Sequence, residues 1–203
     1  MAENREFMNR RLHSLLGVIP IGVFLTQHLI INHFATQGEA AFNSAAGFMG
    51  NLPFVIFLEF ILIYIPILFH AIYGLFIVFQ TKNNTKRYGY FRNQMFLLQR
   101  ITGVILVVFI AWHVWETRVQ AALGAEVNYD MMVDILSSPF MLIFYIIGVI
   151  SATFHFANGL WSFFVSWGLT VSPRSQHIMT YVSIVVFVVL SIIGMRALFA
   201  FVS

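Results

Sequence analysis

Four of the seven histidines lie inside long apolar segments, where an imidazole needs a specific reason to be present: His28, His70, His113 and His155. An ionisable side chain at such a depth is costly and usually marks a functional position. A neutral imidazole has two ring nitrogens to satisfy, and a haem iron together with one hydrogen bond satisfies both. These residues therefore indicate axial ligation of haem.

The segments that carry these histidines are long enough to cross a membrane. The chain is 60% hydrophobic and only 9% charged, whereas a soluble domain carries about 25% charged residues. A spanning helix needs about 20 mainly apolar residues. The runs do not alternate as barrel strands do, and lipid forces backbone groups to bond within each segment. We expect an all-α membrane protein, with residues 1–203 as a single integral membrane domain and spans near 15–31, 54–79, 96–115, 140–167 and 178–202.

The basic residues predict the orientation of these spans, because cytoplasmic connections carry an excess of Lys and Arg. The N-terminal tail and the second connection are rich in them, the first connection has none, and the third has only Arg118. We therefore expect the N-terminus in the cytoplasm and the C-terminus outside. The residues concerned are Arg5, Arg10, Arg11, Lys82, Lys86, Arg87 and Arg92.

The orientation places the four histidines at two depths, at a helical rise of about 1.5 Å per residue. His28 and His113 fall about 20 and 25 Å above the inner edge, and His70 and His155 roughly 23 Å below the outer edge. Two histidines at one depth on different helices suit the two axial positions of a haem. We expect two haems in a core of four helices, one near each membrane face, with the fifth helix beside that core.

A glycine follows each inner histidine by one helical turn, in Phe69-His70-x-x-x-Gly74-Leu75 and in Phe154-His155-x-x-x-Gly159-Leu160. A glycine at this spacing leaves the same helix face free of a side chain, so that a flat macrocycle can approach the backbone. Gly74 and Gly159 are therefore expected to pack against the inner haem.

A second echo links the first and third spans. Gly17-Val18-Ile19 precedes His28 much as Gly103-Val104-Ile105 precedes His113, although the match needs a one-residue gap. Taken alone, it is a weak indication of duplication.

Other readings of the histidines remain open. A single membrane histidine can be merely an interhelical hydrogen-bond partner. A zinc or copper site would need three or four clustered ligands, often with Cys, Met or carboxylate among them. A transporter could use the histidines for metal or protons, although intramembrane carboxylates are scarce and inverted repeats with broken helices are not apparent. The chain has no cysteine, which excludes disulfides, thiolate-bound clusters and covalent c-type haem here. Its basic residues are not clustered with aromatic residues as nucleic-acid binding would require.

Several motifs along the whole chain resemble one known family, the cytochrome b subunits of succinate:menaquinone oxidoreductase, of the five-helix type with two haems in one polypeptide. The motifs that carry the resemblance are Asn4-Arg5-Glu6-Phe7, Arg10-Arg11-Leu12-His13-Ser14-Leu15-Leu16-Gly17, Gln27-His28, Phe91-Arg92-Asn93, Gln99-Arg100-x-Thr102-Gly103, Trp112-His113-Val114-Trp115-Glu116-Thr117-Arg118 and Phe154-His155-Phe156-x-Asn158-Gly159-Leu160-Trp161-Ser162.

The resemblance implies a location, cofactors and partners. The location is the bacterial cytoplasmic membrane. His70 and His155 would hold an inner haem b of higher potential, and His28 and His113 an outer one of lower potential. A flavoprotein that oxidises succinate and an iron–sulfur protein would bind on the cytoplasmic side, so that electrons pass through both haems to menaquinone. The alternative within this class is a dihaem anchor of a fumarate reductase or of another quinone-linked dehydrogenase.

Two further groups of residues are candidates for this chemistry. Arg11, Arg92 and Arg100 lie at the inner level, where they could pair with haem propionates or could serve only as topology determinants. Glu59 lies near the start of the second span, at about the depth of the outer pair. Its carboxylate either reaches out to the interface or exchanges protons with a quinone beside the outer haem.

Overall fold

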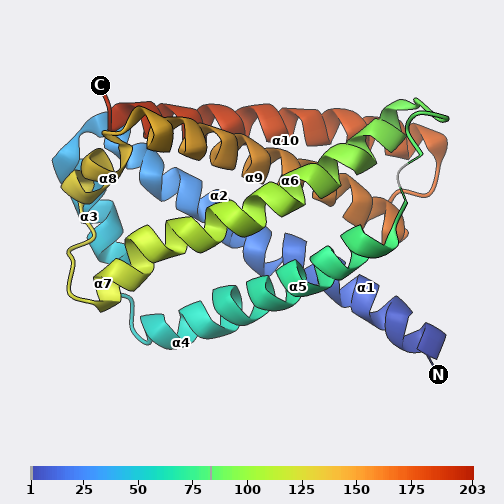
Figure 1. Ribbon diagram of the computed structural model, residues 1–203, viewed down its shortest axis with the longest axis horizontal. Helices are drawn as coiled ribbons and strands as arrows, with labels where there is room; N and C mark the ends of the chain where they lie inside the picture. The colour runs from blue at the N-terminus through green and yellow to red at the C-terminus, as the bar shows by residue number, and fades with distance from the viewer. Residues whose placement is uncertain (1, 83) are drawn as a thin grey trace.

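The long apolar runs of the chain form helices packed side by side (Figure 1). The computed structural model describes residues 2–82 and 84–203, and these residues contain helices and no strand. The elements are α1 (Ala2–Val18), α2 (Pro20–His33), η1 (Phe34–Gln37), α3 (Glu39–Gly50), α4 (Val55–Glu59), η2 (Phe60–Tyr64), α5 (Ile65–Gln80), α6 (Phe91–Val114), η3 (Trp115–Val119), α7 (Gln120–Ala122), α8 (Tyr129–Leu136), α9 (Pro139–Ser166) and α10 (Pro173–Ala200).

Consecutive elements join into five helices that are long and apolar enough to cross a membrane, which confirms the expected all-α architecture with five spans. Several begin or end outside the apolar runs, since polar residues can form the interfacial turns of a helix. The last span, for example, begins at Pro173, and Ser172 and Ser175 form a capping box there. The five spans are Asn4–Gln37, Val55–Gln80, Phe91–Ala122, Pro139–Ser166 and Pro173–Ala200.

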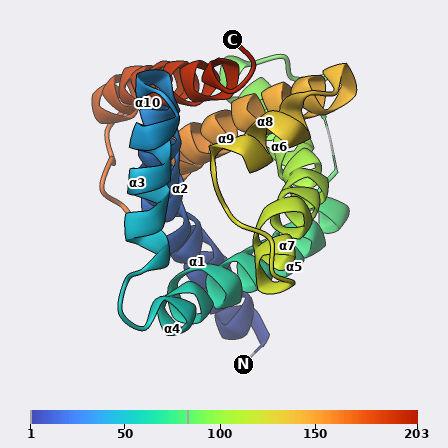
Figure 2. The ribbon, with the colours of Figure 1, turned by 90° about the vertical axis from the view of Figure 1, so that its left-hand side faces the viewer.

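Four of the spans enclose the centre of the bundle. α1 packs on α5, α5 on α6, α6 on α9, and α9 on α1, so the four helices form a closed ring. The end view in Figure 2 shows this ring, with α5 and α9 at opposite corners. α10 lies outside it, against α9 and α2. This arrangement agrees with the expected four-helix core flanked by a fifth helix.

Two spans change to π-helix in their outer halves. In the second span η2 ends two residues before Pro66, which has no N–H to offer the preceding turn. In the third span η3 begins two residues after His113, and the Thr117 hydroxyl donates to the His113 carbonyl over 2.6 Å. Insertions of this kind often accompany functional sites.

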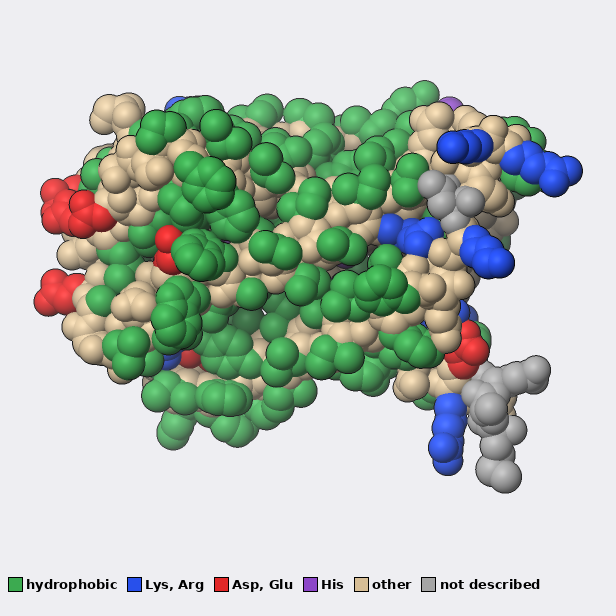
Figure 3. All heavy atoms as spheres, in the orientation of Figure 1, with side chains coloured by type: hydrophobic (Ala, Val, Ile, Leu, Met, Phe, Trp, Pro, Cys, Tyr) green, Lys and Arg blue, Asp and Glu red, His purple; other side chains and the backbone are tan. Residues whose placement is uncertain are grey.

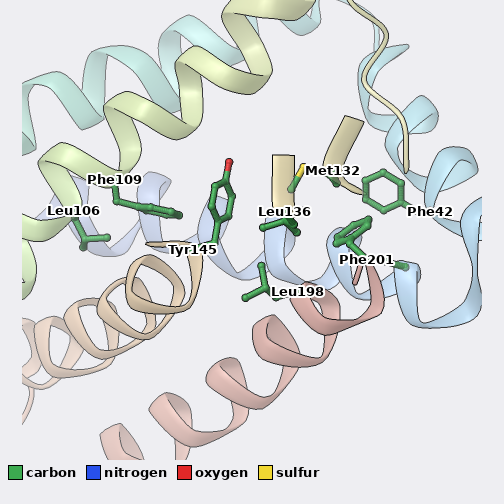
Figure 4. Close-up of a cluster of buried hydrophobic side chains, with 9 residues drawn as sticks. Phe42, Leu106, Phe109, Met132, Leu136, Tyr145, Leu198 and Phe201 are labelled. Atoms are coloured by element: carbon green, nitrogen blue, oxygen red, sulfur yellow. The ribbon is translucent and has the colours of Figure 1, made fainter. Parts of the chain in front are cut away.

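Short helices cover the outer end of the bundle. Phe42 of α3, Tyr129 of α8 and Phe201 pack together, with ring centroids 5.0 to 6.1 Å apart. The Tyr129 hydroxyl donates to the Ala200 carbonyl, and its backbone N–H donates to Asn43 Oδ1 over 2.7 Å. Figure 4 shows the buried cluster that contains Phe42 and Phe201, against which Tyr129 packs, and which continues to α6 and α9.

Charged side chains gather at the two ends of the molecule and leave an apolar belt between them (Figure 3). Most Lys and Arg lie at the end that holds the N-terminus and the connection between α5 and α6, and most acidic residues lie at the other. Because Lys and Arg favour the cytoplasmic side, this separation agrees with a cytoplasmic N-terminus, which stays a prediction.

Candidate functional site

The two inner histidines face each other across the ring of helices. The ring centroids of His70 on α5 and His155 on α9 are 6.1 Å apart, and the ring planes are inclined by 81°. His70 Nδ1 donates to the His13 carbonyl over 2.9 Å, and His155 Nδ1 donates to the Gln99 carbonyl over 3.1 Å. Each ring is thereby oriented by a backbone acceptor, and its Nε2 is the nitrogen left to bind a metal.

The two outer histidines form a second pair. The ring centroids of His28 on α2 and His113 on α6 are 5.8 Å apart, with ring planes inclined by 72°. His113 Nδ1 donates to the Tyr145 hydroxyl over 3.2 Å, and that hydroxyl donates to Glu116 Oε2 over 3.2 Å. His28 Nε2 lies 3.4 Å from the Asn32 side-chain nitrogen, at the limit of a hydrogen bond. His113 is thus oriented by a side-chain hydroxyl, whereas the inner histidines are oriented by backbone carbonyls.

Both separations fit a metal held between two imidazoles. With metal–nitrogen bonds of about 2 Å on each side, the two ring centroids lie roughly 6 Å apart. Among the described residues, no three His, Cys, Asp or Glu side chains come together in a metal site. A haem needs only two protein ligands, because its macrocycle supplies the remaining positions around the iron. The four histidines therefore form two pairs, each with the spacing that two ligands of one haem would need.

Buried donors without acceptors provide a second test of the fit. In the part of the chain that the structure describes, five buried side-chain atoms have no hydrogen-bond partner, and all belong to residues of the inner half. Each can donate, so an anionic group with several acceptor oxygens would satisfy them. Haem propionates are such groups. The atoms are Tyr73 Oη, Arg92 Nη1, Arg100 Nε, Trp167 Nε1 and Thr170 Oγ1.

The three arginines considered for propionates have different surroundings. The Arg11 guanidinium lies over the rings of Phe7 and Trp167, at 4.9 and 5.0 Å from their centroids. That of Arg92 lies 4.1 Å from the Trp161 ring centroid, and its Nη1 is buried without a partner. Stacking on an aromatic ring leaves the edge of a guanidinium free for an anion.

Arg100 is engaged differently. Its Nη2 donates to the carbonyls of Val78 and Thr81, which are left without helical partners where α5 ends. Arg100 therefore caps α5, and its buried Nε remains without a partner.

The glycines near the inner pair lie where two helices touch. Gly74 and Gly159, which the sequence singled out, face the side chains of His13 and Gln99: a Cβ there would lie 3.1 and 3.3 Å from them. Gly17 and Gly103 are the ones that face the histidines themselves. Sequence reasoning did not assign them to the site, although the repeated Gly-Val-Ile motif marked both positions.

Glu59 forms an ion pair that the sequence did not reveal. Arg118 of η3 donates from Nε and Nη2 to both carboxylate oxygens, over 2.8 to 3.1 Å. The Glu59 side chain is 20% exposed, so the carboxylate is largely withdrawn from solvent. Glu59 directly precedes η2, and the pair therefore joins the two spans at their π-helical segments.

Comparison with known proteins decides the family. Residues 80–194 match the family model of the succinate dehydrogenase/fumarate reductase transmembrane subunit. The succinate dehydrogenase cytochrome b558 subunit of Bacillus subtilis (strain 168) is 61% identical over 202 residues, covering the full length of both chains. The chain belongs to this family of transmembrane subunits. Its closeness to the Bacillus protein confirms that it is a cytochrome b subunit of the succinate dehydrogenase type.

Membership of this family bears on the predicted cofactor, on the predicted location and on the direction of the reaction. A cytochrome b subunit implies haem b as the cofactor of the histidine core. The family and the five apolar helices make the chain a multi-pass bacterial membrane protein. The family description also includes fumarate reductase, so it leaves the direction of the reaction open.

Proposed function

We propose that the chain is the dihaem membrane anchor of a succinate dehydrogenase, passing electrons from an iron–sulfur subunit to menaquinone. Two b haems supply one-electron carriers, one near each membrane face. The observation that carries the proposal is the presence of two histidine pairs, with ring centroids 6.1 and 5.8 Å apart, on the first four spans.

The chain's own residues hold and orient these cofactors. His70 and His155 would hold the inner haem, and His28 and His113 would hold the outer one. A haem held by two histidines would offer no place for oxygen to bind, which suits electron relay. Arg11 and Arg92 supply positive charge at the inner end, where propionates would be neutralised.

The inner end is also where the soluble subunits would dock. The Bacillus relative is named as a subunit of succinate dehydrogenase, and we infer a flavoprotein and an iron–sulfur protein as partners here. The basic end of the molecule faces the cytoplasm in the predicted orientation (Figure 3). A partner bound there lies on the side of His70 and His155, so the inner site receives electrons first.

Menaquinone reduction takes two electrons and two protons, and Glu59 is the candidate for moving a proton. The Glu59 carboxylate, held by Arg118, would take up a proton from the outer side and pass it to a quinone oxygen. The guanidinium holds the carboxylate in one orientation.

A reduced-minus-oxidised optical spectrum of the purified chain, with haem counted per polypeptide, tests the proposal. We expect two low-spin b haems per chain. His70→Ala and His28→Ala should each leave one haem, of different midpoint potential, because each variant removes one axial ligand. A well-inserted protein without haem would contradict the proposal and return attention to a transporter.

Glu59→Gln tests the proton path separately. General acid–base groups typically contribute about 10²–10⁴-fold, so menaquinone reduction should fall at least about 10-fold. The amide still accepts a hydrogen bond from Arg118, and reduction of both haems by succinate should be unchanged. Glu39→Gln, an exposed outer carboxylate, is the control. Wild-type quinone reductase activity in the Glu59 variant would eliminate this role.

Anchoring of a fumarate reductase or of another dehydrogenase is the second candidate, because the family description covers fumarate reductase as well. Purification of the intact complex in mild detergent separates these possibilities. Subunits with succinate-oxidising activity support the first proposal, and a hydrogenase or formate dehydrogenase would replace it.

A further inference from the structure

The inner histidines sit in two matching helix pairs that are built by the same rule. In each antiparallel pair, both helices carry a polar side chain followed four residues later by a glycine. The polar side chain of each helix lies against the glycine of the other. The chain thus contains the same interlocking contact twice, once around each inner histidine.

The first contact joins α1 and α5. A Cβ on Gly17 would lie 2.4 Å from His70 Cε1, and a Cβ on Gly74 would lie 3.1 Å from His13 Nε2. The His13 ring stacks on the His70 ring, with centroids 4.0 Å apart and planes inclined by 7°. The His13 carbonyl accepts the hydrogen bond from His70 Nδ1. A single turn of α1 therefore contacts the His70 ring through the His13 ring and carbonyl and through the Gly17 backbone.

The second contact joins α6 and α9 in the same register. A Cβ on Gly103 would lie 3.1 Å from His155 Cε1, and a Cβ on Gly159 would lie 3.3 Å from Gln99 Nε2. The Gln99 carbonyl accepts from His155 Nδ1, and its side chain donates to the His155 carbonyl over 2.9 Å. Asn158 holds the Gln99 side chain from α9 through a 2.8 Å hydrogen bond.

We propose that Gly17 and Gly103 are positioning residues for the inner haem: each lets a backbone carbonyl one turn earlier reach Nδ1 of an axial histidine. The inference rests on the proposed function. A side chain at either glycine would move the neighbouring helix away from the histidine, lengthen the Nδ1 hydrogen bond and release the ring. Outer partners of a metal ligand typically change metal affinity by about 10–100-fold when they are lost.

The outer histidine pair is held by different contacts. A substitution at Gly17 or Gly103 should therefore affect the inner site selectively. Among the described glycines, none has an atom of His28 or His113 among the three atoms nearest to its Cβ position. Those rings stack instead on phenylalanines one turn earlier in their own helices, Phe24 at 5.4 Å and Phe109 at 5.7 Å between centroids. Loss of the glycine contacts should therefore disturb the inner haem and spare the outer one.

The contact between α1 and α5 differs from the contact between α6 and α9 in how close the glycine lies to the histidine and in one polar side chain. The Gly17 contact leaves less room than the Gly103 contact, 2.4 against 3.1 Å. The first contact has His13 at the position where the second has Gln99. Of the two inner histidines, His70 is therefore the one with an imidazole stacked on it. The Gly17 position should therefore be the more sensitive, and His13 fixes the plane of the His70 ring.

The experiment compares Gly17→Ala and Gly103→Ala with Gly47→Ala in α3, where a Cβ meets nothing within 4 Å. Haem is counted per chain, and the low-spin ferric EPR signals and midpoint potentials of both haems are recorded. We expect inner-haem affinity to fall about 10-fold or more in Gly17→Ala, and less in Gly103→Ala. The control and the outer haem should match the unsubstituted protein, and the outer signal also reports that each variant is folded.

A more conservative variant, His13→Gln, places in the contact between α1 and α5 the residue type that Gln99 supplies in the contact between α6 and α9. It keeps the backbone carbonyl and removes the stacked ring, so both haems should bind while the inner EPR signal shifts. His177→Gln, an exposed imidazole on α10, is the matched control.

The outcomes separate this inference from the proposed function. Two haems with unchanged signals in Gly17→Ala would overturn the positioning role and leave the dihaem anchor standing. Loss of both haems in Gly17→Ala, with unchanged signals in Gly103→Ala and His13→Gln, would also overturn it. An unsubstituted chain without haem would contradict the proposed function itself.

Discussion

At the scale of single residues, His113 differs from the two inner histidines in what accepts its Nδ1 hydrogen bond. The inner ligands donate to main-chain carbonyls, which move only when a helix moves. His113 donates to the Tyr145 hydroxyl, a side-chain group that also contacts Glu116. In Figure 4 the Tyr145 hydroxyl points away from the apolar cluster. The outer site is therefore the one that a single side-chain substitution can change without shifting a helix.

Tyr145→Phe should alter the outer haem selectively. The ring stays packed, since Tyr145 is only 2% exposed, and the substitution removes the hydroxyl that accepts from His113 Nδ1 and donates to Glu116. A histidine without this acceptor is a less basic ligand, so the midpoint potential of the outer haem should rise while that of the inner haem stays the same. Loss of the hydrogen bonds should lower stability by about 1 kcal/mol. A redox titration of both haems checks this, and equal shifts at the two haems would contradict it.

At the scale of helices, small residues determine how closely the spans pack. A Cβ on Gly148 of α9 would lie 2.3 Å from the Phe109 ring of α6. Phe109 is buried and stacks on His113, so the glycine also determines where an outer ligand lies. Glycines at helix contacts are common in membranes, where close approach replaces the hydrophobic effect as a source of stability.

Gly148→Ala should therefore destabilise the contact between α6 and α9. Overpacking in a dense interior typically costs about 1–3 kcal/mol, and the midpoint of thermal unfolding in detergent should fall. Gly50→Ala at the end of α3, with nothing within 4 Å, is the control. The contact would be looser than the structure indicates if both variants unfolded at the same temperature.

At the scale of the whole molecule, charge separates along the bundle axis. The basic end and the acidic end are joined by an apolar belt (Figure 3), and the connections between helices alternate between these ends (Figure 1). Because Lys and Arg are retained on the cytoplasmic side, the whole bundle has a preferred direction in the membrane. That direction determines which of the two histidine pairs lies nearer the cytoplasm.

Labelling of single cysteines tests this orientation against a clean background, since the chain contains no cysteine. In intact cells a membrane-impermeant maleimide should label Ser203→Cys and leave Lys86→Cys unlabelled. Opening the cells should make Lys86→Cys reactive. The reverse pattern would invert the topology and would place His28 and His113 on the cytoplasmic side.

The sequence alone determined the features that follow from periodicity and solvent. Run length and composition indicated five helices, since lipid leaves the backbone no other way to bond. A constant rise per residue then sorted His28 with His113 and His70 with His155 by depth. The structure brings the same residues together in pairs.

Only the tertiary structure decided which groups surround each histidine, because rotation and register between helices depend on packing that no single helix encodes. It showed that Gly17 and Gly103 lie against the inner histidines. Gly74 and Gly159 lie instead against His13 and Gln99 on the neighbouring helices. It also joined Glu59 to Arg118, which lie 59 residues apart in the chain. Depth along a helix is a property of the sequence, but the neighbour at that depth is a property of the fold.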